Sequence, residues 1–345
     1  MRRSPYAAHR AFVAPALLSG TMFTVVLGYC LIEFGYYLTY DVIEALLLAL
    51  QPDWIAAFFT GSTPLGLGAQ LASFGILAAI VMFVVRRLHH RAPSGLIGPP
   101  RAALRQFFAV LAPVTLLLFA LEFVPPWWSA DALQATRPPL LWLALLPLSL
   151  GAIFVQIAAE ELLYRGYLQQ QLAALFAHPA SWLILTNLAF GFAHWDIESD
   201  LVHNMQYATW AFCFGIAASD LTARSGTLGP ALAFHLANNA FAFLLYGEAG
   251  GPSSGFALFP PSPPSLPSSS SSSVRLLNCV LCLMSAFRAA SLRAFSRTSA
   301  SVIGITSGAF SASLSSLSGS VFSAGAGSSA ATFFLAVFFL RAIFF

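Results

Sequence analysis

The sequence is poor in charge. Only 8% of its 345 residues are Asp, Glu, Lys or Arg, whereas 58% are hydrophobic, and its mean hydropathy is +0.77. A soluble domain carries about 25% charged residues, so this chain lacks the side chains that a water-facing surface needs. We therefore expect an integral membrane protein surrounded by a lipid bilayer. The net charge of +3 also falls short of the dense basic patch that nucleic-acid binding requires, so we expect no nucleic-acid partner.

Cysteine is scarce too, with four residues in the chain. Cys30 and Cys213 lie in apolar runs, where cysteine usually behaves as a small hydrophobe. Cys279 and Cys282 form a CxxC pair, but no second pair or nearby histidine accompanies them. The sequence therefore gives little support to a zinc site at these cysteines. No cleavable signal peptide is evident.

Long apolar runs are abundant in the sequence. They predict an all-α bundle of about seven to eight transmembrane helices with a polar active site inside the membrane. A membrane span needs roughly 20 apolar residues. An outer loop or re-entrant stretch holding Asp41, Glu44 and Asp53 is expected between the first two spans. The YLQQQL segment after the fourth span is expected to bend into the membrane interface. The predicted spans cover about 12–38, 64–85, 106–124, 139–165, 180–195, 205–223 and 230–246.

The placement of arginine predicts the orientation of these spans. Arg137 alone falls on the outer side if the N-terminus is cytoplasmic, as the excess of cations in cytoplasmic loops requires. The arginines expected on the cytoplasmic side are Arg2, Arg3, Arg10, Arg86, Arg87, Arg91, Arg101, Arg105, Arg165 and Arg224.

Composition changes sharply after about residue 250. Residues 251–345 are rich in serine and contain no Asp or Glu, yet they keep many phenylalanines. Because this matches neither a disordered tail nor a folded domain, we hypothesise a shifted reading frame; the alternative is a genuine low-complexity tail with a final hydrophobic segment. The predicted division is an N-terminal span and loop at 1–60, a core at 61–250 and this tail.

Ionisable groups within the spans are candidates for function, because they are costly to insert into a membrane. Glu160 and Glu161 appear together after a long uncharged run. Glu161 and Arg165 are four residues apart and can form an ion pair on one helical face. Adjacent helical residues point about 100° apart, so Glu160 is expected on another face with a separate role. Read alone, the cluster also fits charges that close a span at the interface.

Two further pairs show the same four-residue spacing. Phe190 and His194 share one helical face, and so do His235 and Asn239. Each pair, read alone, also fits a structural hydrogen bond. The charged run at 195–200 that follows His194 is interpreted as a loop outside the hydrocarbon.

A turn at His178-Pro179 would bring Glu160 and His194 to similar depth on neighbouring helices. Such a pair can hold a water molecule, and peptide hydrolysis needs an activated water and a stabilised oxyanion. We expect Glu160 as general base and His194 as the group that orients the water. His235 and Asn239 would stabilise the oxyanion. The sequence leaves open an alternative in which Glu160, His194 and His235 bind a divalent metal such as zinc.

The motifs EELLYR, FGFAH and HLANN, in this order, resemble those of the CPBP family, the CAAX proteases and bacteriocin-processing (Abi) proteins. The resemblance covers about residues 60–250 and implies an α-helical intramembrane peptidase related to type II CAAX prenyl endopeptidases. It implies Glu160 and His194 as catalytic residues, His235 and Asn239 at the oxyanion, and Glu161 and Arg165 in support. A further membrane helix usually follows the third motif in this family, where this chain has its serine-rich tail.

The expected function is thus a membrane-embedded endopeptidase that acts on a peptide or membrane-protein substrate in a bacterial inner membrane. Two other classes remain open. One is a catalytically silent scaffold or immunity protein, and the other is a proton-coupled transporter. The absence of internal repeats counts against the transporter.

Overall fold

A computed structural model of the chain describes residues 5–122, 137–196, 199–245 and 253–258. These residues are predominantly helical, and no strand occurs among them. Backbone contacts divide the chain into two units, and the first takes in residues 1–195 and 202–281. The fold and site described below belong to this first unit.

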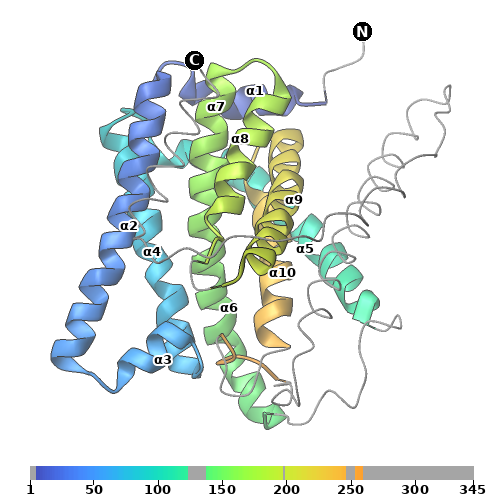
Figure 1. Cartoon of the computed structure of the whole chain (residues 1–345). Coiled ribbons are helices and arrows are strands. Elements are labelled where there is room, and N and C mark those ends of the chain that lie inside the picture. The colour runs from blue at the N-terminus through green and yellow to red at the C-terminus, as the bar shows by residue number, and fades with distance from the viewer. Residues whose placement is uncertain (1–4, 123–136, 197–198, 246–252, 259–345) are drawn as a thin grey trace, which may run out of the picture. The chain divides into compact units, whose positions relative to one another are not determined.

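The prediction of an all-α protein is confirmed. Prolines occupy the first turn of α4, α6, α8 and α10, where the missing amide hydrogen costs no helical bond. The helices are α1 Ala7–Val13, α2 Met22–Leu50, α3 Trp54–Thr60, α4 Pro64–Arg87, α5 Pro100–Glu122, α6 Pro139–Glu161, α7 Gln169–Leu175, α8 Pro179–Phe192, α9 Leu201–Ser225 and α10 Gly229–Leu244 (Figure 1). Short 3₁₀ turns at Ala14–Ala16 and Pro93–Leu96 and a π-helical stretch at Leu162–Leu168 complete them.

Within the residues that the structure describes, four helical segments are long and apolar enough to cross a membrane: Met22–Leu50, Pro64–Arg87, Pro93–Ala120 and Pro139–Leu175. A shorter apolar helix, Pro179–Phe192, accompanies them. The integral-membrane class is therefore supported, whereas the predicted count of seven to eight spans is not confirmed.

The first predicted span and the loop after it are wrong in their boundaries. Helix α2 begins at Met22, because the hydroxyl of Thr21 accepts from the amide of Thr24 and caps the helix. The helix continues to Leu50, so Asp41 and Glu44 lie within α2 and not in a loop. Asp53 is the residue that precedes α3.

The arginine-rich segments gather at one end of the first unit. There the amide of Leu228 donates to the carbonyl of Ile97 at 3.0 Å, and the hydroxyl of Tyr6 donates to Asp220 at 2.7 Å. At the opposite end, Arg137 donates to the carbonyls of residues 255 and 257. The predicted separation of Arg137 from the other described arginines thus agrees with the fold. Arg165 differs from the expectation, since it is fully buried within the helices.

The YLQQQL segment is also buried in protein. The chain stays helical through the π-helical stretch into α7, and the three glutamines at its start are 0% exposed. Their amides bind polar groups of neighbouring elements; for example, Gln170 donates to the carbonyl of Gly95 at 3.0 Å.

Residues 253–258 pack against the helices. Phe256 is 1% exposed and lies in an apolar cluster with Leu67 and Leu71 of α4 and Ile153 and Ile157 of α6. The start of the predicted tail is thus part of the packed unit. The hypothesis of a shifted reading frame concerns residues beyond 258, which lie outside the described part of the chain.

Candidate active site

The site begins where α6 gives way to the π-helical stretch. Glu160 and Glu161 are the last residues of α6, and Arg165 follows within Leu162–Leu168. The guanidinium of Arg165 donates to Glu161 Oε1 at 2.9 Å, and both side chains are 0% exposed. The predicted ion pair is therefore present. Single π-turns often accompany functional sites in helices, and this one follows the two carboxylates directly.

Helix α10 brings an imidazole to both carboxylates. The Nδ1 atom of His235 lies 2.8 Å from Glu161 Oε1, and its Nε2 atom lies 3.6 Å from Glu160 Oε2. The side chains of Glu160 and Glu161 point in different directions from α6, as expected, yet both lie next to His235. This is possible because the two ring nitrogens of His235 reach in different directions. A residue from another helix, not the spacing along α6, joins them.

A glutamine that the sequence reasoning missed links Glu160 to Asn239. The amide of Gln156 donates to Glu160 Oε1 at 2.5 Å, and the amide of Asn239 donates to Gln156 Oε1 at 2.9 Å. Asn238 donates in turn to Asn239 Oδ1 at 3.0 Å. Gln156 lies four residues before Glu160, so its position on the same helical face was available as a signal.

His194 lies near this group but makes no direct hydrogen bond to it within the described part of the chain. Its Nδ1 atom lies 2.7 Å from the carbonyl oxygen of Phe190, at the end of α8. The ring of Phe190 is 4.6 Å from the His194 ring and 6.3 Å from the His235 ring. The structure thus brings Glu160, Glu161, His235 and Asn239 into one hydrogen-bonded cluster through Gln156, while His194 lies beside it and packs against Phe190.

Arg165 has further partners that sequence reasoning did not identify. Its NH2 group lies 3.4 Å from Asn187 Oδ1, and the amide of Asn187 donates to Ser219 of α9 at 2.9 Å. The guanidinium also lies 4.3 Å from the centre of the Phe190 ring. These contacts hold the cation, and through it Glu161, in a fixed position.

A third carboxylate lies close by on α2. The hydroxyl of Tyr164 donates to Glu33 Oε1 at 3.4 Å. Tyr164 itself packs edge-on against Phe190, with the ring centres 4.9 Å apart. Glu33 lies inside the first apolar run of the sequence. Ionisable groups within membrane spans are candidates for function, so Glu33 could have been identified from the sequence in the same way as Glu160.

The hydrogen bonds leave one open position. Glu161 is held by Arg165, so its carboxylate accepts the Nδ1 hydrogen of His235, and a neutral imidazole then carries its lone pair on Nε2. That lone pair faces Glu160 Oε2, which is buried and has no hydrogen-bond partner among the described residues. Two acceptors 3.6 Å apart need a shared hydrogen donor. A water molecule that donates one hydrogen to each atom would meet this need. A proton on Nε2 of the imidazole would also meet it.

The expected metal alternative fits less well. Across the described ranges, no three His, Cys, Asp or Glu side chains are grouped so that they can hold a metal ion. His235 can offer only Nε2, since Nδ1 is bonded to Glu161. We therefore derive no step through a metal, and the chemistry below uses the side chains of the chain itself.

The arrangement is that of a polar cluster enclosed by the apolar helices of a membrane protein. A family model described as Type II CAAX prenyl endopeptidase Rce1-like matches residues 140–241, a range that contains every residue of this cluster. This match supports the resemblance of the three motifs to the CPBP family.

One curated relative is also similar. The uncharacterized protein YyaK of Bacillus subtilis (strain 168) is 28% identical over 139 residues, which cover 39% of this chain and 43% of that protein. The chain thus spans less than half of the relative that it matches. No solved structure matches the chain.

Proposed function

We propose that this protein is an intramembrane endopeptidase in which Glu160 activates water. The observation that carries the proposal is the buried Glu160 Oε2 atom, which lacks a hydrogen-bond partner among the described residues and lies 3.6 Å from His235 Nε2. A carboxylate beside an imidazole that a second carboxylate orients is a suitable site for a nucleophilic water.

The proposed reaction uses each polar group once. Glu160 takes a proton from the bound water while the hydroxide attacks the carbonyl carbon of the peptide bond. Breakdown of the tetrahedral intermediate then breaks the C–N bond, and Glu160 gives its proton to the leaving amine. His194 donates through Nδ1 to its own helix, so its Nε2 lone pair is free to orient the water.

Oxyanion stabilisation is the proposed task of His235 and Asn239. Asn239 has two amide hydrogens, and one of them is bonded to Gln156. The other can donate to the oxyanion. His235 can donate to the oxyanion through Nε2 when that atom carries a hydrogen, as in the second arrangement described for the site, while Glu161 accepts from Nδ1. Glu161 and Arg165 are positioning residues in this scheme.

The proposed setting is a bacterial inner membrane with a cytoplasmic N-terminus and a peptide or membrane-protein substrate. The four apolar helical segments support the membrane setting, and the gathering of arginines at one end supports the proposed orientation.

The test is cleavage of a lipidated peptide library by the protein reconstituted in vesicles. Glu160→Gln and His235→Ala are expected to lower the rate about 10²- to 10⁴-fold, the usual contribution of acid–base catalysis. Glu44→Gln is the matched control, since Glu44 is an exposed carboxylate on α2. Equal cleavage by all variants would refute the proposal. No cleavage by any form would favour a scaffold or immunity protein, and proton flux without cleavage would favour a transporter.

Metal dependence is read in the same assay. The glutamate-based scheme predicts the same rate before and after metal chelation. Loss of the rate on chelation and its return with zinc would establish the metal alternative instead.

A further inference from the structure

A second polar feature lies at the arginine-rich end, away from the catalytic cluster. A cavity of about 730 Å³ opens between the loop before α2 and the loop that follows α4. His89, His90 and Arg91 line it, and none of its 14 lining residues is Asp or Glu. The ionisable side chains that line this cavity in the described part of the chain are therefore all basic.

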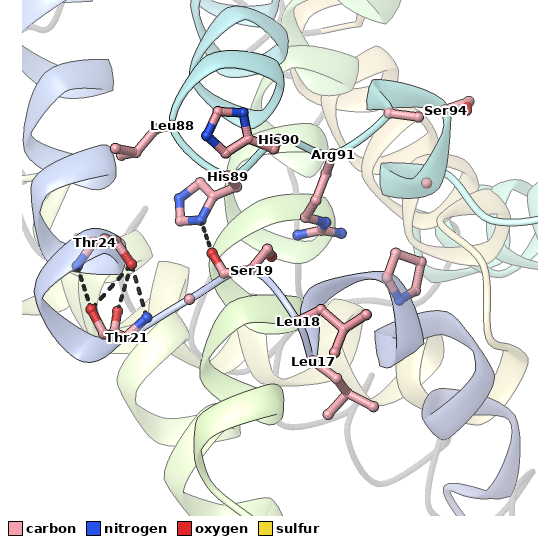
Figure 2. Close-up of a pocket in the computed structure, with 14 residues that line it drawn as sticks. Leu17, Leu18, Ser19, Thr21, Thr24, Leu88, His89, His90, Arg91 and Ser94 are labelled. Carbon is pink, nitrogen blue, oxygen red and sulfur yellow. Dashed lines mark hydrogen bonds between the residues drawn. The ribbon is translucent and has the colours of Figure 1, made fainter.

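Arg91 is the unusual member of this cavity. Figure 2 shows its guanidinium pointing toward the segment that contains Leu17, Leu18 and Ser19. The side chain is 6% exposed, and its NH2 group donates to Gln170. Its Nε and NH1 atoms are buried without a hydrogen-bond partner among the described residues. Three N–H donors of a charged group are thus left unused.

Such an arrangement is costly unless hydrogen-bond acceptors complete it, and a charged group favours an anionic acceptor. A buried donor without a partner loses its hydration and gains nothing in return, and the cost is larger for a charged group. Burial lowers the pKa of Arg91 to about 10, so the guanidinium still carries its charge at neutral pH. A phosphate group suits these donors, because it carries a negative charge and offers several acceptor oxygens to a guanidinium.

The surroundings indicate where the phosphate comes from. Leu17 and Leu18 line the same cavity and are 61% and 98% exposed. Exposed leucines beside a basic cavity suit the acyl chains and head group of a lipid, and basic pockets at the cytoplasmic ends of membrane helices are known sites for anionic head groups. We propose that this cavity binds the phosphate of an anionic phospholipid, with Arg91 as its main ligand.

The first test measures the thermal unfolding midpoint of the full-length protein in an uncharged detergent. Dioctanoyl phosphatidylglycerol is the anionic probe, and dioctanoyl phosphatidylcholine and inorganic phosphate are compared at the same concentrations. The anionic lipid is expected to raise the midpoint by several degrees, because a ligand that binds the folded state stabilises it. A rise of the same size with phosphatidylcholine would overturn the proposal. A rise with inorganic phosphate and none with the anionic lipid would also overturn it.

Variants of the lining residues test whether the rise in the unfolding midpoint depends on this cavity. Arg91→Gln removes the charge and is expected to abolish the rise, whereas Arg86→Gln, at an exposed arginine outside the cavity, should keep it. Leu18→Glu places a carboxylate at the exposed mouth and should also abolish the rise without changing the core. If Arg91→Gln does not fold, the result with Leu18→Glu shows whether the lipid binds in the cavity. Unchanged rises in both cavity variants would show that the lipid binds elsewhere. The readout is independent of peptide cleavage, so it stands or falls separately from the proposed peptidase activity.

Discussion

Replacing Arg165 by methionine tests whether the buried ion pair holds the site together. The structure predicts a large loss of stability, because Glu161 remains buried at 0% exposure and, among the described residues, keeps His235 as its one polar partner. Removing one member of a buried pair typically costs about 3–5 kcal/mol, since the other charge is left uncompensated. The lost contacts to Asn187 and the Phe190 ring add to the effect.

The chain offers a matched control for this substitution. Arg224 and Asp220 form a second ion pair with the same four-residue spacing, but their side chains are 45% and 19% exposed. An exposed pair is worth about 0–1 kcal/mol, so Arg224→Met should cost little. The double variant Glu161→Gln/Arg165→Met removes both charges and should recover much of the stability while losing any activity that depends on an oriented His235.

The assay is unfolding by sodium dodecyl sulfate in mixed micelles, followed by far-ultraviolet circular dichroism. It yields the free energy of unfolding for each variant under one condition. The reasoning fails if Arg165→Met and Arg224→Met lose the same stability to within about 0.5 kcal/mol, the usual scatter of surface substitutions. In that case the enclosed position of Arg165 would have no energetic consequence.

Three further predictions concern packing and pH. Gly229→Ala should cost about 1–3 kcal/mol in the same assay, because the new Cβ would lie 2.0 Å from the carbonyl oxygen of Ala103, whereas Gly151→Ala meets nothing within 4 Å and should be neutral or slightly stabilising. Phe256→Ala should cost about 3–5 kcal/mol if residues 253–258 are an integral part of the fold, and a loss under 1 kcal/mol would contradict this. Burial lowers the pKa of His9 from 6.5 to about 4, so the unfolded chain binds this proton more readily; the unfolding midpoint should therefore fall as pH drops from about 6.5 to 4, and His9→Phe should flatten that part of the profile.

The sequence alone determined that this protein is surrounded by lipid, and it determined the spacing of the motifs. Low charge and long apolar runs require a membrane, and proline in the first turn marks the start of several helices. The ion pair of Glu161 with Arg165 was also predictable, because it depends on helical geometry over four residues. The wrong boundaries of the first span arose because apolar content does not show where a helix is capped.

Only the tertiary structure decided which groups meet across helices. The crossing of α6 and α10 joins Gln156 to Asn239 and places His235 between the two glutamates. It also leaves His194 beside the cluster without a direct hydrogen bond to it, with its ring packed against Phe190. Local spacing cannot supply such pairings, because they depend on how far each helix is rotated and shifted against its neighbour. That relation is set by side-chain packing over the whole length of both helices.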